Sequence, residues 1–65
     1  MLYYIKANIF ATKLGKNFGR TVSAVIIANN KEDAFKEANK SFKNYCANLE
    51  KNHNNTFDYT DLIVE

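Results

Sequence analysis

Few residues in this chain belong to the types that perform covalent chemistry, and their spacing does not bring them together. Cys46 and His53 are the sole cysteine and histidine among 65 residues. Cys46 stands at helical spacing from apolar neighbours, as small buried residues do, and His53 adjoins an Asn-rich segment typical of a solvated loop. Because a nucleophile and a base that do not meet form no catalytic pair, the sequence predicts that the protein is not an enzyme.

The residues that could hold a metal or a phosphate are equally dispersed. One Cys and one His cannot supply the four ligands of a structural zinc site. Asp58 and Asp61 lie three residues apart in an expected strand, where their side chains would point to opposite faces. Gly15 and Gly19 lead into a strand rather than a helix N-terminus, so they form no phosphate loop. We expect neither a metal nor a cofactor.

Basic residues and an aromatic residue cluster near the first expected turn. Lys13, Lys16 and Arg20 surround Phe18, and such a mixture can bind the phosphates and bases of nucleic acids. The isoelectric point near 8.8 lies below the value of about 9 that is typical of a dedicated nucleic-acid-binding domain. A nucleic-acid-binding module that uses these four residues and an aromatic sheet face is therefore the alternative function.

Two strands are expected in the first half of the chain. Residues 2–14 contain no Pro or Gly, and their odd positions from Tyr3 to Ala11 are all apolar, which is typical of a strand with one face on the core. Residues 15–19 would form a hairpin loop, and residues 20–28 a second strand whose even positions are apolar.

The register of this hairpin follows from its apolar faces. A four-residue loop at 16–19 would pair Ile9 with Ile26 and Ala11 with Ala24, which places both apolar faces on the same side of the sheet.

A helix and a third strand are expected in the second half. Asn30 is a suitable N-cap, and apolar residues recur at intervals of three and four, which predicts a helix over 31–51 with one core-facing stripe. Residues 56–64 would form the last strand, where apolar residues change parity, which indicates either a bulge near Asp61 or a strand end that is apolar on both sides.

These elements predict one α+β domain, β-β-α-β, over residues 1–65. A right-handed crossover from the second strand over the first places the third strand antiparallel on the far side of the first. The result is a three-stranded antiparallel sheet of order 2-1-3, with one helix packed on one face. The basic first strand then lies beside the acidic third strand.

One helix can cover only one face of such a sheet, and the other face is rich in large apolar residues. We expect the contact residues to be Tyr4, Phe10, Val25 and Ile27. The sequence thus predicts a non-catalytic interaction protein that binds, and in doing so inhibits or regulates, a protein partner. A chain of this size buries a modest core, so we also expect a homodimer in which two such faces, or two edge strands, meet.

Composition indicates a setting for this function. Ten Asn and eight Lys against one Arg and no Pro are typical of an A/T-rich genome, such as that of a bacterial virus or mobile element. No apolar run reaches the length of about 20 residues that a membrane span needs, and we see no signal peptide. We expect a cytoplasmic protein, which for a viral product means the host cytoplasm.

Overall fold

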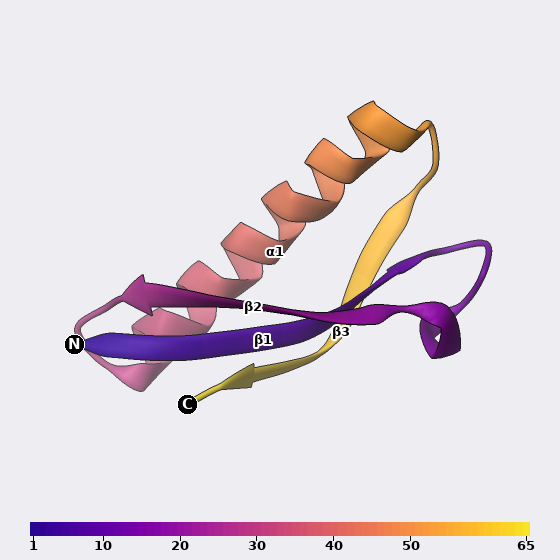
Figure 1. Ribbon diagram of the computed structural model, residues 1–65. Coiled ribbons are helices and arrows are strands. Elements are labelled where there is room, and N and C mark those ends of the chain that lie inside the picture. The colour runs from indigo at the N-terminus through magenta and orange to yellow at the C-terminus, as the bar shows by residue number, and fades with distance from the viewer.

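The computed structural model describes all 65 residues as one sheet covered on one side by one helix (Figure 1). The elements, in chain order, are β1 (Leu2–Ala11), the short 3₁₀ helix η1 (Lys16–Phe18), β2 (Arg20–Ile27), α1 (Lys31–His53) and β3 (Phe57–Val64). The three strands form an antiparallel sheet of order β2-β1-β3. The predicted α+β fold, strand order and single helix are confirmed.

The hairpin between β1 and β2 differs from the prediction in its register. Ile9 lies opposite Arg20 and Ile5 opposite Ala24, so the expected pairing of Ile9 with Ile26 is wrong by six residues. β1 ends at Ala11 rather than at residue 14, and the connection contains a turn and η1 instead of a four-residue loop. Since six is an even number, the same faces of the two strands still point toward the helix.

Gly19 shows why the hairpin closes where it does. A Cβ atom built on Gly19 would lie 2.5 Å from Oδ1 of Asn8 and 2.6 Å from the carbonyl oxygen of Ile9. The Asn8 side chain also donates to the carbonyl of Lys16 at 2.9 Å. The residue before β2 therefore passes so close to β1 that only glycine fits.

The helix α1 is capped at both ends by asparagine. The Asn30 side chain accepts a hydrogen bond from the Asp33 amide at 2.8 Å, which confirms the predicted N-cap. Asn54, with a φ of 55°, ends the helix in the left-handed conformation, and its amide donates to the Glu50 carbonyl. The helix reaches His53, two residues beyond the expected end, because this left-handed residue follows it.

A bulge in β3 reverses which residues face the helix. Asp61 has a φ of 58°, and the pairing of β3 with β1 shifts between Lys6 and Asn8. Before the bulge, odd residues such as Tyr59 pack against the core, whereas after it the even residues Leu62 and Val64 do so. The predicted bulge is confirmed, and it explains the change of parity in the sequence.

The core is small and lies between α1 and the centre of the sheet. Its eight buried residues are Ile5, Ala7, Ile9, Ala34, Ala38, Phe42, Cys46 and Val64. Small side chains on both surfaces let the helix approach β1 closely. The Tyr59 hydroxyl donates to Oδ1 of Asn39 at 2.8 Å, and its ring packs 5.9 Å from that of Phe42, so α1 is fixed over the β1–β3 side.

This placement of α1 leaves the helix-side face of β2 only partly covered. The helix packs far more against β3 than against β2, and Figure 1 shows it diverging from the hairpin toward its C-terminal end. Ala24 belongs to the apolar face predicted for β2, yet it is exposed to solvent. The helix therefore covers β2 incompletely: Val22, Ile26 and the adjoining Ala28 are half-buried against the core, whereas Ala24 is not covered.

The bulge gives a first testable prediction. Asp61→Val places a β-branched residue at a positive φ, which should lower the free energy of unfolding by about 1–2 kcal/mol. Asp61→Gly, which accepts this conformation freely, should leave stability unchanged or raise it. Urea unfolding followed by circular dichroism measures both variants. Equal stability of the valine and glycine variants would contradict the left-handed conformation at this position.

Candidate functional site

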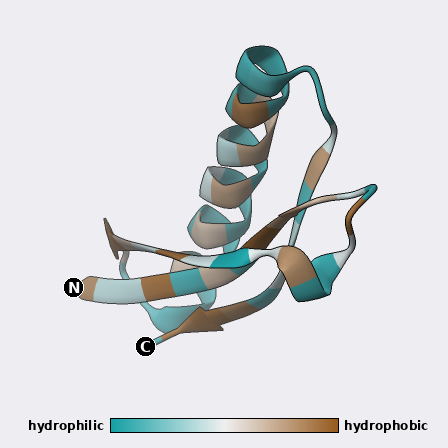
Figure 2. Cartoon of the chain, turned by 45° about the vertical axis from the view of Figure 1, so that its right-hand side comes forward, coloured by the Kyte–Doolittle hydropathy of each residue, from teal (hydrophilic) through white to brown (hydrophobic).

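The open face of the sheet carries a continuous group of exposed apolar side chains at one end. This open-face patch consists of Leu2, Tyr4, Val25, Ile27 and Ile63. Leu2 pairs with Ile27 and Tyr4 with Val25 across the hairpin, and Leu2 and Ile27 are 70% and 78% exposed. Figure 2 shows the hydrophobic ends of the strands meeting near the two chain termini.

Three backbone features position the patch. Met1 and Ala28 exchange two backbone hydrogen bonds of 3.0 Å, which hold the open end of the hairpin. Tyr4 and Glu65 exchange two more at 2.9 and 2.7 Å, which tie the end of β3 to β1. The Asp61 bulge then places Ile63 beside Lys6 on the open face. The patch is therefore built on paired strands rather than on loops.

Two charged side chains lie among the residues of the patch: Lys6, on the central strand, pairs with Ile63, and Glu65 pairs with Tyr4. The structure forms one ion pair, between Lys6 Nζ and Glu65 Oε1 at 3.8 Å, and both side chains are substantially exposed. An exposed pair of this kind contributes little to stability.

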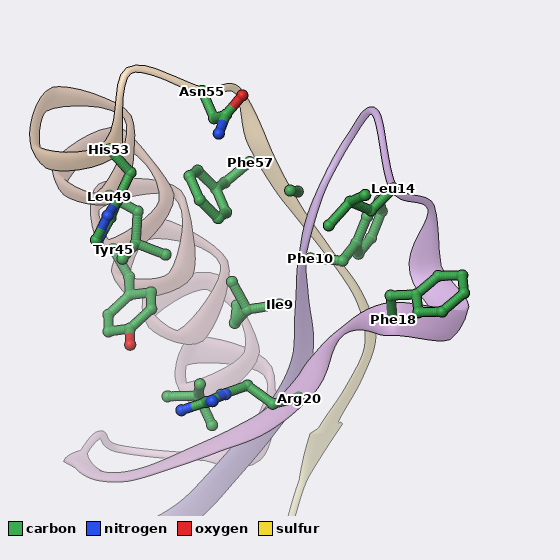
Figure 3. Close-up of a pocket in the computed structure, with 12 residues that line it drawn as sticks. Ile9, Phe10, Leu14, Phe18, Arg20, Tyr45, Leu49, His53, Asn55 and Phe57 are labelled. Atoms are coloured by element: carbon green, nitrogen blue, oxygen red, sulfur yellow. The ribbon is translucent and has the colours of Figure 1, made fainter.

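The structure brings together three of the four predicted contact residues and separates the fourth. Tyr4, Val25 and Ile27 lie in the patch. Phe10 lies six residues farther along β1 than Tyr4, a distance of about 20 Å for the length that each residue adds to a strand. Phe10 is half-buried and lies beside Leu14 at the hairpin end (Figure 3).

An open groove runs between this hairpin end and the C-terminal half of α1. Its volume is about 500 Å³, and nine of its twelve lining residues are hydrophobic. Tyr45, Leu49 and His53 form one wall, and Leu14 and Phe18 stand on the other side (Figure 3). The groove exists because α1 diverges from β2.

The predicted nucleic-acid residues do not form one surface. Lys13, Lys16 and Phe18 are exposed at the hairpin end, and Phe18 is 78% exposed. Arg20 has the parity of the helix-side face, lines the groove, and extends toward α1 (Figure 3). A strand of nucleic acid at the tip would therefore meet two lysines and one ring, without the arginine.

The residues considered for catalysis remain apart. Cys46 is buried in the core, and His53 lies two helical turns away, about 10 Å along the axis, with its ring 6.1 Å from that of Phe57. No three metal-ligating side chains come together in the structure. The expectation for the two aspartates is wrong, because the bulge turns Asp61 to the open face, the same face as Asp58, beside Lys6 and Asn8.

Ile63 is the patch residue that sequence reasoning missed. Its parity matches that of Phe57 and Tyr59, which face the core, and only the bulge moves it to the open face. The signal available in the sequence was the change of apolar parity around Asp61. The groove had no sequence signal, because it depends on the angle between α1 and the hairpin.

Comparison with protein families, with curated proteins and with solved structures gives no match for this chain. The helix α1, although 23 residues long, is not apolar enough to cross a membrane. Function is therefore inferred from the geometry of this chain alone.

The buried thiol gives a prediction about alkaline stability. Burial, together with the negative charges of Asp58 and Glu50, raises the pKa of Cys46 above its usual 9.0, and burial likewise raises the pKa of Tyr59 above 10.0. Both groups are neutral below these values, so their contribution to stability is full there and is lost as pH rises through the folded-state pKa.

We therefore expect the free energy of unfolding to be level up to about pH 9 and to fall above it. Urea unfolding at several pH values between 7 and 11 measures the change. Cys46→Ala should start from a lower stability and decline less steeply. A decline of equal slope in Cys46→Ala would show that the thiol is not responsible.

Proposed function

We propose that this is a non-catalytic interaction protein, homodimeric, that binds a protein partner and thereby inhibits or regulates it. The observation that supports the proposal is the open-face patch, which exposes Leu2, Tyr4, Val25, Ile27 and Ile63 on a rigid sheet. A contiguous exposed apolar group of this kind is typical of an interaction surface and is costly to leave in water.

The chemistry of the patch favours a protein as its ligand. The patch carries one aromatic ring and four aliphatic side chains, and the charged side chains beside them, Lys6 and Glu65, pair with each other. Because a tyrosine buries a large surface at small entropic cost, Tyr4 is the residue we expect to contribute most to binding.

The composition supports a setting for the proposal. Asn and Lys dominate the polar residues, as in the products of A/T-rich viral or mobile genomes. In that setting the protein would act in the cytoplasm of the host and would obstruct a host protein by occupying its surface.

The patch can be tested by comparing variants in the same capture experiment. Tagged protein is incubated with a bacterial lysate, and bound proteins are identified by mass spectrometry. We expect the double variant Tyr4→Lys/Val25→Lys to lose at least tenfold in affinity, about 1.4 kcal/mol, for whichever protein the natural chain retains. Phe10→Lys, on the same strand but outside the patch, should retain it.

A second control lies on the solvent side of the helix. Lys40→Glu changes the charge of an exposed residue far from the sheet, and it should leave capture unchanged. Circular dichroism confirms that each variant is folded. If capture survives the double variant and is lost instead in Phe10→Lys, the binding surface is the groove end of the hairpin and the patch proposal is wrong.

A further inference from the structure

The two edge strands of the sheet, β2 and β3, differ in how accessible their unpaired backbone groups are to another strand. Every edge strand presents a row of N–H and C=O groups that can pair with another strand. On β2 the even residues pair with β1, as the bond from the Ala28 amide to the Met1 carbonyl shows. The outward row therefore belongs to the odd residues Thr21, Ser23, Val25 and Ile27.

The edge formed by β3 is protected against further pairing. The Asp58 carboxylate accepts a hydrogen bond of 2.8 Å from the adjacent Tyr59 amide, which occupies an outward donor and adds a negative charge. The bulge at Asp61, with its positive φ, interrupts the regular row. Charges and bulges are the devices by which edge strands avoid pairing.

After the exposed Arg20 at its start, the edge formed by β2 carries none of these devices. Residues 21–27 include no charged residue, no proline and no bulge, and their pairing with β1 is continuous. Five of the seven are β-branched, a composition that favours extended strands. The molecule thus blocks one edge and leaves the other suited to receive a strand.

The helix-side face of β2 is also incompletely covered. Ala24 is exposed there, and Val22 and Ile26 are half-buried, because α1 lies over β1 and β3. A strand added beside β2 would bury the flanks of these side chains as well as satisfy its outward backbone groups.

We infer that β2 pairs antiparallel with β2 of a second copy, about a two-fold axis at Ala24. This deepens the homodimeric part of the proposed function by naming its interface. In this register Thr21 lies opposite Ile27 of the second copy and Ser23 opposite its Val25, which forms about eight inter-chain hydrogen bonds. The two sheets become one sheet of six strands.

A second copy suits this edge because the strand is complementary to itself. Val22 meets Ile26 of the second copy on the helix side, a favourable β-branched pair. Ala24 meets Ala24 at the centre, where opposite side chains come closest and small residues fit. No like charges oppose each other, since residues 21–27 are neutral.

The size of the core supports self-association. Only eight of the 65 residues are buried, and chains this small commonly gain stability from a partner chain. The two-fold axis runs perpendicular to the sheet, so both helices lie on one side and both open-face patches on the other. Dimerisation through β2 therefore places the two open-face patches next to each other on one surface, with the flanks of Val25 and Ile27 at the interface and their outer surfaces accessible.

Charge substitutions at Ala24 test the interface and its register together. Sedimentation equilibrium should give the natural chain the mass of two copies, against 7.5 kDa for one. Ala24→Lys and Ala24→Glu should each give single chains, because like charges would face each other about 5 Å apart. An equimolar mixture of the two variants should recover the dimeric mass. Thr60→Lys, on the protected strand β3, should remain dimeric.

A cross-link gives an independent measurement of the register. In a Cys46→Ala background, Ala24→Cys should form an inter-chain disulfide under mild oxidation, since the two Cβ atoms lie within reach of one another. Val22→Cys should not, because its copy would stand about 13 Å away along the strands.

Two results would overturn the inference. One is a natural chain that sediments as a single copy at about 100 µM, where a specific dimer should form by mass action. The other is a dimer that survives both Ala24 substitutions and lacks the disulfide, which would place the contact elsewhere. Partner capture is judged separately. If Ala24→Lys is monomeric and still captures a partner, the patch proposal is supported. If the natural chain is dimeric but captures no partner, only the patch proposal is wrong.

Discussion

The attachment of α1 to β3 is the interaction on which the remaining architecture depends. The Tyr59 hydroxyl bonds to Asn39, and the Tyr59 ring packs on Phe42, so the helix lies across β1 and β3. One helix of this diameter cannot also shield a third strand. The exposed helix-side face of β2, the groove beside the hairpin and the bare open face all follow from that placement.

Because of the bulge at Asp61, the single strand β3 can pack residues from both of its halves against α1. Without it, β3 could not present both Tyr59 and Val64 to the core, because they differ in parity. A residue in the left-handed conformation resolves the conflict at a local cost. The same residue also disturbs the outer edge of β3 and moves Ile63 into the open-face patch, so one backbone distortion serves the core, the edge and the surface.

Apolar surface is distributed unevenly over the molecule. The buried core consists of eight residues, of which three are alanine, while large side chains such as Leu2 and Ile27 remain exposed. A chain that leaves this much apolar surface in water is suited to bind other chains. Because the edge of β3 is protected and the edge of β2 is not, we expect chains to associate through β2 and to stop at a dimer instead of aggregating.

The elements, their order and the core-facing sides of β1, β2 and α1 could be predicted from local patterns in the sequence. Asn30, the helical stripe and the alternation in β1 act locally, through capping and side-chain periodicity, so they can be recognised without a structure. The exposure of Tyr4, Val25 and Ile27 on the open face followed from the same parity.

The hairpin register, the angle between α1 and the sheet, and the separation of Phe10 from the patch depend on tertiary contacts. Parity repeats every two residues, so registers that differ by six residues satisfy the same pattern. Only the close passage of Gly19 against Asn8 selects one of them. The angle between α1 and the sheet likewise depends on contacts between residues far apart in the chain, such as Asn39 and Tyr59. No local sequence pattern predicts such contacts.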